Sequence, residues 1–355
     1  SYSVTGVQTC ALPISSDASI LFSAPDPERA EYAVHIPMLA ASSRSNVLIL
    51  GGGPGGAVLE ALKYLDVRSL TLVELDPSVF MLARTHLGER YTADTRIQTV
   101  AADPRAFLSR TRDRFDIIIM TAPAPLSGLA NRTYTREFFR LASSRMTPGG
   151  VIGFALEGSE NYIDGDLARF LASIRTELRA AFPSVAVLPG LECRFIASNH
   201  AGALDGLTWE RLETARVRLG IETSYVRDWF LRFIMSPERV SALTAALDEA
   251  ADPPPNTDMR PAGYLVRTII QGKSDSSKVI RSVGALTGKK VLMTVLLLFA
   301  VATLAPLLPY GRNAHARMAA SLVFIEGFAG ISFTMIGIMA DRKSTRLNSS
   351  HRIRS

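Results

Sequence analysis

The chain has 355 residues, of which 47% are hydrophobic and 20% are charged, with 39 Lys and Arg against 33 Asp and Glu. This length and apolar content suit one large or two smaller folded domains, and they exclude a disordered chain and a collagen-like fibre. Two cysteines, Cys10 and Cys193, are too few for a disulfide framework. The net charge of +6 suggests an anionic partner, and the mean hydropathy of +0.17 calls for a search for membrane segments.

The two ends of the chain do not resemble natural protein sequence. Residues 4–14 read VTGVQTCALPI and residues 341–351 read DRKSTRLNSSH. One choice of codons for the first string has a reverse complement that encodes the second, and this DNA string looks like a sequencing adapter. We therefore predict that residues 1–15 and 341–355 are translated adapter and that the natural protein is interrupted at both ends. Residues 341–355 carry five basic and one acidic side chain, so without the ends the net charge falls to +2 and no longer indicates an anionic partner.

Strands and helices are predicted to alternate from residue 47 onward. A short apolar run closed by glycines predicts a buried parallel strand over residues 47–50, and further strands are predicted over residues 69–73, 96–100, 115–120, 151–156, 185–188 and 193–197. Helices are predicted over residues 57–65, 77–87, 134–145 and 167–181, with a short one opening at 103–104. Residues 207–250 predict two helices around an extended piece at 223–233. The alternation predicts an α/β fold with a Rossmann-like, doubly wound parallel sheet.

Two long apolar runs follow a polar linker at residues 272–290. Residues 291–309 contain no charged residue, and residues 318–340 contain one, Glu326. Each run is long enough to cross a bilayer core of about 30 Å, so we predict a transmembrane helical hairpin over residues 291–340 rather than two buried core helices. Basic residues are more numerous before the first run than in the connecting loop, which predicts an integral membrane protein with the domain at residues 16–271 on the cytoplasmic side.

Glycines and carboxylates follow the first three predicted strands. Gly51, Gly52, Gly53 and Gly55 allow the backbone to approach a ligand closely, although such a run serves dinucleotides as well as adenosyl sulfonium compounds. Glu74 ends the second strand, where a carboxylate can accept both ribose hydroxyls, unless it is simply a solvated strand end. Asp103 follows the third strand, where it can accept from an adenine amino group, cap a helix, or do both. Asp76, a predicted helix cap beside Pro77, completes the cofactor-binding candidates.

At these residues the chain resembles the spermidine synthase-like aminopropyltransferases. The resemblance is carried by VLILGGGPGG, LTLVELDP, AADPRAF, FDIII and YTREFFRLASSRMTPGG, and it runs from about Glu31 to Asn199. The segments PLSGLANRTYTREFF and SENYI are more similar to the branch of that family fused to transmembrane helices. The resemblance implies a class I S-adenosylmethionine-type core that binds decarboxylated S-adenosylmethionine, or its product methylthioadenosine, and transfers an aminopropyl group to an amine. It also implies that Glu74 binds the ribose and Asp103 the adenine.

The chain departs from that family where the amine would bind. The soluble synthases have an Asp in the glycine loop, where this chain has Pro54, and an acidic pair after the fourth strand, where it has Thr121 and Ala124. In the family these carboxylates hold the ammonium group and deprotonate the attacking amine, and a general base contributes roughly 10²–10⁴-fold. No catalytic residue is therefore predicted. The remaining candidates for the amine site are Glu31, Tyr32, His35, Tyr134 and Glu157, of which we select Glu31, His35 and Tyr134.

Three functions stay open from the sequence. The first is a membrane-anchored aminopropyltransferase. The second is an inactive nucleoside-binding sensor attached to a transport-like membrane unit, and the third is an S-adenosylmethionine-dependent methyltransferase. The expected partners are a nucleoside, a polyamine and the membrane, and a homo-oligomer is compatible with the sequence. Nucleic acid is not expected because no basic stripe is interleaved with aromatic residues, and no residue spacing indicates a metal site.

Overall fold

The computed structural model describes residues 12–16, 19–24, 26–52, 56–78, 80, 94–121, 125, 127–160, 163, 165–250 and 253–263, and for residues 12–24 it describes the backbone alone. Its strands are β1 (Leu12–Ser16), β2 (Ser19–Ala24), β3 (Asn46–Leu50), β4 (Ser69–Glu74), β5 (Ile97–Ala101), β6 (Phe115–Met120), β7 (Met146–Ser159), β8 (Ser184–Leu188), β9 (Gly190–Ser198), β10 (Asn256–Thr257) and β11 (Arg260–Pro261). Its helices are α1 (Pro27–Ala40), α2 (Ala57–Leu62), α5 (Pro104–Arg110), α6 (Gly128–Asn131), α7 (Arg136–Ser144), α8 (Gly165–Arg179), α9 (Trp209–Arg218), α10 (Asp228–Ile234) and α11 (Pro237–Asp248).

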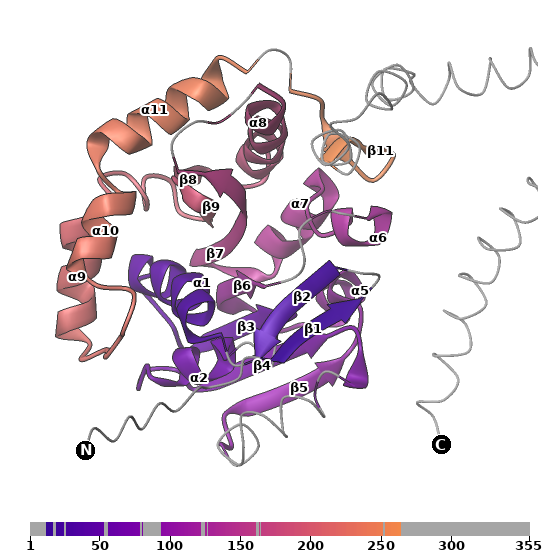
Figure 1. Ribbon diagram of the computed structural model, residues 1–355. Coiled ribbons are helices and arrows are strands. Elements are labelled where there is room, and N and C mark those ends of the chain that lie inside the picture. The colour runs from indigo at the N-terminus through magenta and orange to yellow at the C-terminus, as the bar shows by residue number, and fades with distance from the viewer. Residues whose placement is uncertain are drawn as a thin grey trace, which may run out of the picture. The chain divides into compact units, whose positions relative to one another are not determined.

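A seven-stranded sheet organises these elements (Figure 1), in the order β5-β4-β3-β6-β7-β9-β8. Strands β3 to β7 run parallel, and β9 is inserted antiparallel between β7 and β8. The predicted Rossmann-like α/β fold is confirmed, and the sheet is mostly rather than wholly parallel. Parallel neighbours align their carboxyl ends, so the ends of β5, β4, β3 and β6 form one continuous edge.

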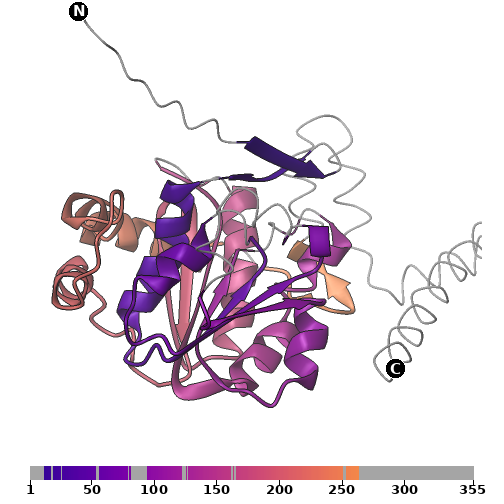
Figure 2. The same ribbon diagram turned by 90° about the horizontal axis from the view of Figure 1, so that it is seen from below.

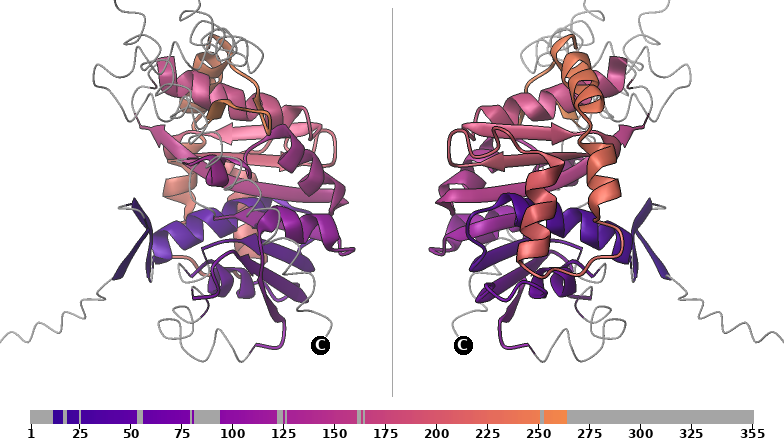
Figure 3. Two further views of the ribbon diagram at one scale, coloured as in Figure 1. Left: turned by 90° about the vertical axis from the view of Figure 1, so that its right-hand side faces the viewer. Right: turned by 90° about the vertical axis from the view of Figure 1, so that its left-hand side faces the viewer.

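Successive side chains of the central strands divide the core between the two faces of the sheet. In β3, Val47 and Ile49 pack on the face covered by α1, α2, α9 and α10, whereas Leu48 and Leu50 pack on the face covered by α5, α7, α8 and α11. All four are buried, as expected for a parallel strand covered on both sides. Figure 2 shows helices on either side of the strands, and Figure 3 shows α9 and α10 beside α1. The long apolar runs in the sequence therefore place β3 and β6 at the centre of the sheet.

Helix α1 was not predicted from the sequence, although its start carries a recognisable signal. The Asp26 side chain accepts a hydrogen bond from the Arg29 backbone N–H at 3.0 Å, and Pro27 occupies the first turn. Pro37 lies inside the helix, and buried residues occur on most of its second half, so no amphipathic period stands out. The helix forms because it is packed on the sheet, with Pro37 against Gly153.

The predicted extended piece at residues 223–233 is wrong for its second half, which forms α10. Its aromatic and β-branched residues favour a strand by propensity alone. In the structure, however, Phe230, Leu231 and Ile234 share the buried side of one helical turn and join the core around α1. Tertiary packing outweighs local propensity in this segment. Strand β7 also begins at Met146, five residues before the predicted start at Val151.

Several other predictions concern residues outside this core. Residues 12–15, which were predicted to be adapter sequence, pair with β2 in an antiparallel hairpin. Contacts divide the chain between Ile280 and Arg281, and every described residue belongs to the first part. No helix among the described residues is long and apolar enough to cross a membrane. The linker and the two predicted spans at residues 272–340 lie outside the described residues.

Candidate nucleoside site at the carboxyl edge of the sheet

Strand β3 ends in a glycine turn that brings bare backbone to the carboxyl edge of the sheet. Gly51 and Gly52 have φ angles of 83° and 68°, and Gly56, which precedes α2, has 99°. Glycine adopts this left-handed region readily, whereas other residues are strained there. A Cβ added to Gly52 would also overlap the side chain of Thr121. The positive φ angles explain why glycine occupies these three positions, whereas Gly53 and Gly55 lie outside the described residues.

Glu74 lies on the neighbouring strand end, next to this turn. Its carboxylate accepts a hydrogen bond from the Leu75 backbone N–H at 2.9 Å, and the N–H groups of Asp76 and Gly52 also face it. Burial raises the pKa of Glu74 above its usual value, and these three backbone hydrogen bonds oppose that rise. Within the described residues, Glu74 has no ion pair. A half-buried carboxylate beside a glycine turn suits hydroxyl donors of a ligand.

Asp103 occupies the corresponding position after β5, the next strand along the edge. Its side chain caps α5 by accepting from the Ala106 N–H at 3.0 Å, and its second oxygen lies 3.6 Å from an Arg132 guanidinium nitrogen. The helix-cap interpretation is therefore confirmed, and among the described residues the other carboxylate oxygen makes only this long ion pair. Asp76, by contrast, is exposed and accepts from the Ser78 N–H and hydroxyl at 2.9 and 2.7 Å.

Thr121 closes the edge on the other side, directly after β6. Its hydroxyl donates to the Gly51 carbonyl at 2.6 Å, and its backbone N–H donates to the Leu50 carbonyl at 3.0 Å. Asp103, Glu74, the glycine turn and Thr121 thus follow one another along four adjacent strand ends. Ala124, the second position that is acidic in the family resembled, lies outside the described residues.

Glu31 and His35, two of the three predicted substrate residues, are bound within the protein. Glu31 is 3% exposed and accepts from the backbone N–H groups of Ser224, Tyr225 and Val226. His35 is fully buried, and its two ring nitrogens contact the Tyr64 hydroxyl at 2.9 Å and Glu60 at 2.8 Å. These contacts give both side chains a role in packing α1 against the following helices, because each polar atom already has a partner inside the protein.

Tyr134, the third predicted substrate residue, is also fully buried. Its ring stands edge-on to Phe154, with centroids 5.6 Å apart, and burial raises the pKa of its hydroxyl. The charges of Arg29 on α1 and Glu192 on β9 also act on the pKa of that hydroxyl. Tyr134 is therefore placed near charged groups, but under cover of the core.

A charged group at the ends of β7 and β9 was not assembled from the sequence. Glu157 and Glu192 are cross-strand partners there, and Arg29 of α1 contacts Glu192 at 3.1 Å. Arg194 lies 4.7 Å from the centre of the Tyr32 ring and 3.9 Å from the Glu192 carboxylate. Burial and the nearby Glu28 raise the pKa of Tyr32 to about 12. The pairing of β7 with β9 and the packing of α1 on β7 bring these residues together, so no local sequence signal could have found them.

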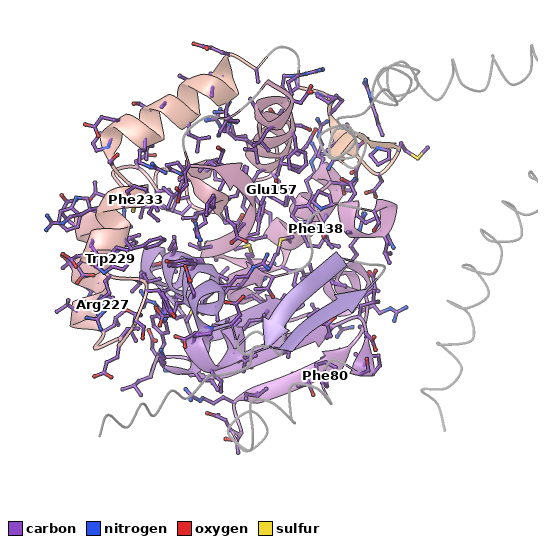
Figure 4. All side chains as sticks on the ribbon, in the orientation of Figure 1. Phe80, Phe138, Glu157, Arg227, Trp229 and Phe233 are labelled. Atoms are coloured by element: carbon purple, nitrogen blue, oxygen red, sulfur yellow. The ribbon has the colours of Figure 1, made fainter. Side chains whose placement is uncertain are left out.

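This charged group lies apart from the exposed aromatic side chains of α10. In Figure 4, Glu157 lies in the middle of the view, whereas Trp229 and Phe233 project from α10 at the left. Those two aromatic side chains are 57% and 46% exposed. The acidic pair therefore belongs to the strand-end region of the sheet and not to the aromatic surface of α10.

Comparison with known proteins identifies close parallels to this arrangement. Residues 28–199 match the spermine/spermidine synthase domain. The chain is 37% identical over 142 residues to a polyamine aminopropyltransferase of Oceanobacillus iheyensis, which covers 38% of this chain and 28% of that protein. It is 34% identical over 187 residues to polyamine aminopropyltransferase 2 of Pseudomonas aeruginosa, covering 49% and 54%. The chain thus spans between about a quarter and about half of the length of these relatives.

Solved structures show the same fold. A spermidine synthase in complex with the transition-state analogue AdoDATO matches with a TM-score of 0.54 and 21% identity, over 64% of this chain and 78% of that chain. The spermidine synthase of Thermotoga maritima matches with a TM-score of 0.50 and 20% identity over the same shares. At these identities the likeness establishes the fold and no more.

Proposed function

Residues 28–199 form a spermine/spermidine synthase domain, and we propose on this basis that the chain is a spermidine synthase-like aminopropyltransferase that binds decarboxylated S-adenosylmethionine. The observation that carries the proposal is the alignment of the glycine turn, Glu74 and Asp103 on adjacent strand ends. This is the edge at which α/β sheets of this kind bind nucleotides and nucleosides. The curated relatives named above are aminopropyltransferases.

Each part of this edge has a distinct task in holding an adenosyl group. The ionised carboxylate of Glu74 accepts hydrogen bonds from the ribose hydroxyls, which are stronger than those between neutral groups. The carboxylate oxygen of Asp103 that does not cap α5 accepts from the adenine amino group. The turn at Gly51 and Gly52 lets the ligand lie directly on the backbone, because no side chain intervenes there.

In the transfer step, the acceptor nitrogen forms a bond to the aminopropyl carbon while the carbon–sulfur bond breaks, methylthioadenosine leaves and the nitrogen gives up a proton. The bound sulfonium supplies the leaving group. Thr121 is not suited to take that proton, since a neutral hydroxyl is a far weaker base than an amine, and the proton is therefore released to water. We propose that Glu157, at the same end of the sheet, attracts the cationic amine, whereas the charge of its cross-strand partner Glu192 is offset by Arg29 and Arg194.

Product analysis tests the proposal directly. The full chain is incubated with decarboxylated S-adenosylmethionine and putrescine, and methylthioadenosine and spermidine are quantified by mass spectrometry. We expect both products in equal amounts, and we expect neither from Glu74→Ala. Transfer of a methyl group from intact S-adenosylmethionine in the same assay would reassign the chain to the methyltransferases. Absence of binding to either nucleoside would refute the proposed site.

One observation favours a second candidate, a nucleoside-binding sensor without turnover. The loop that begins with Thr121 contains no ionisable side chain through Ser127, so no carboxylate from this loop meets the reacting amine. A sensor would bind methylthioadenosine with the same Glu74 dependence and release no product in the assay above. The two candidates therefore share the nucleoside site and differ in a single readout.

We further propose that the domain belongs to the membrane-fused branch of the family and is anchored by residues 291–309 and 318–340, with the domain in the cytoplasm. The support is the length and apolar character of these two segments. Expressed in cells, the full chain should stay in the membrane pellet after alkaline carbonate washing, whereas a chain ending at residue 290 should be released. Release of both chains would contradict the anchoring.

A further inference from the structure

One peptide group of the glycine turn is held from both sides by side chains of neighbouring strands. The carbonyl of Gly51 accepts from the Thr121 hydroxyl at 2.6 Å. The other end of the same peptide, the N–H of Gly52, faces the carboxylate of Glu74. Thr121 and Glu74 are thus connected through a single planar unit, because the C=O and N–H of one peptide cannot rotate independently.

The backbone around this peptide leaves it little freedom. The Gly51 N–H donates to the Val73 carbonyl at 2.8 Å, and the Thr121 N–H donates to the Leu50 carbonyl at 3.0 Å. The Thr121 side chain also lies so close to Gly52 that a Cβ there would overlap it. The main-chain bonds fix where the turn begins, and the Thr121 hydroxyl then fixes which way the Gly51–Gly52 peptide faces.

We propose that Thr121 is a positioning residue for nucleoside binding, whose hydroxyl orients the Gly51–Gly52 peptide so that the Gly52 N–H holds the Glu74 carboxylate in place. This inference rests on the proposed function in one respect, namely that Glu74 binds the ribose. The proposal assigns Thr121 to nucleoside binding and not to binding of the amine.

Affinity for methylthioadenosine, measured by calorimetric titration of the full chain, tests this assignment. Thr121→Val keeps the shape and removes the donor, and we expect about fivefold weaker binding, the effect of losing one typical hydrogen bond. Thr121→Ser keeps the donor and should bind within about twofold of wild type. Thr133→Val is the matched control, since its hydroxyl donates to the Ala130 carbonyl at 2.9 Å away from the glycine turn.

A double-mutant cycle separates positioning from a general loss of stability. If Thr121 acts through Glu74, the fivefold effect of Thr121→Val should shrink to less than about twofold in a Glu74→Gln background. Equal effects in both backgrounds, or Thr121→Ser as weak as Thr121→Val, would overturn the inference. Wild-type chain that binds no nucleoside would refute the proposed function itself. Wild-type affinity in Thr121→Val, with Glu74→Gln impaired, would refute only the role of Thr121.

Discussion

Replacing Glu31 with alanine should destabilise the domain because this carboxylate holds the segment that leads into α10. It accepts from the N–H groups of Ser224, Tyr225 and Val226 at 2.8, 2.8 and 3.1 Å. Each buried donor left without a partner costs about 1–3 kcal/mol, but Ser224 is exposed and can turn to water. We therefore expect a loss of about 3 kcal/mol. In a domain of this size, that lowers the unfolding midpoint by roughly 6–12 °C.

Thermal unfolding of the full chain, followed by circular dichroism, measures this loss. Glu31→Gln should fall between wild type and alanine, because its amide oxygen still accepts. Glu210→Gln, which changes an exposed carboxylate of α9, should leave the midpoint unchanged. A Glu31→Ala midpoint within about 1 °C of wild type, together with a raised KM for the amine, would refute the structural role and return Glu31 to the substrate site.

Two further predictions concern the site edge and the α1–α2 contact. Asp103→Ala should lower the free energy of unfolding by about 1 kcal/mol and also weaken nucleoside binding, whereas Asp103→Ser should keep the helix cap and weaken binding alone. Chemical denaturation measures the stability and titration measures the binding. Equal stability losses in the two variants would contradict the role of Asp103 as the cap. Burial alone would raise the pKa of Glu60, but hydrogen bonds from His35 and Lys63 hold it below its usual value. The stability that Glu60 contributes is therefore present above the usual Glu pKa and lost as the pH falls through the lowered one. Glu60→Gln should make the unfolding midpoint less sensitive to acid in that range, and an unchanged pH profile would refute this linkage.

The sequence was sufficient to predict the centre of the fold and the arrangement of the nucleoside edge. Residues 47–50 of β3 and 117–120 of β6 are continuous apolar runs, and a glycine or a proline follows each of them closely, so their carboxyl ends could be located. Glu74 is the last residue of β4 and Asp103 stands just after β5, and parallel pairing then aligns them on one edge. Both steps depend on residues close together in the chain.

The roles that could not be predicted depend on contacts between distant residues. Glu31 is bonded to amides 193 to 195 positions away, and nothing around it in the sequence indicates them. His35 is likewise paired with Glu60 of α2 and with Tyr64 just after that helix, and an isolated sequence cannot distinguish such a buried histidine from a ligand-binding one. In the sequence, Thr121 is notable only because the family resembled has an acidic residue at this position. Its hydroxyl bond to the Gly51 carbonyl depends on the three-dimensional geometry of the turn.

The affinity of the full chain for methylthioadenosine, compared between wild type and Glu74→Gln by calorimetric titration, tests the central claim most directly. Because Gln is neutral, the variant loses the charge-assisted hydrogen bonds to the ribose, and we predict binding weaker by about ten- to a hundredfold. Because burial raises the pKa of Glu74, its carboxylate is protonated at a higher pH than an ordinary Glu as the solution is acidified. Wild-type affinity should therefore begin to fall at that higher pH during acidification, and the affinity of the Gln variant should not. Equal affinity of the two proteins would contradict the placement of the nucleoside at the carboxyl edge of β3, β4 and β5.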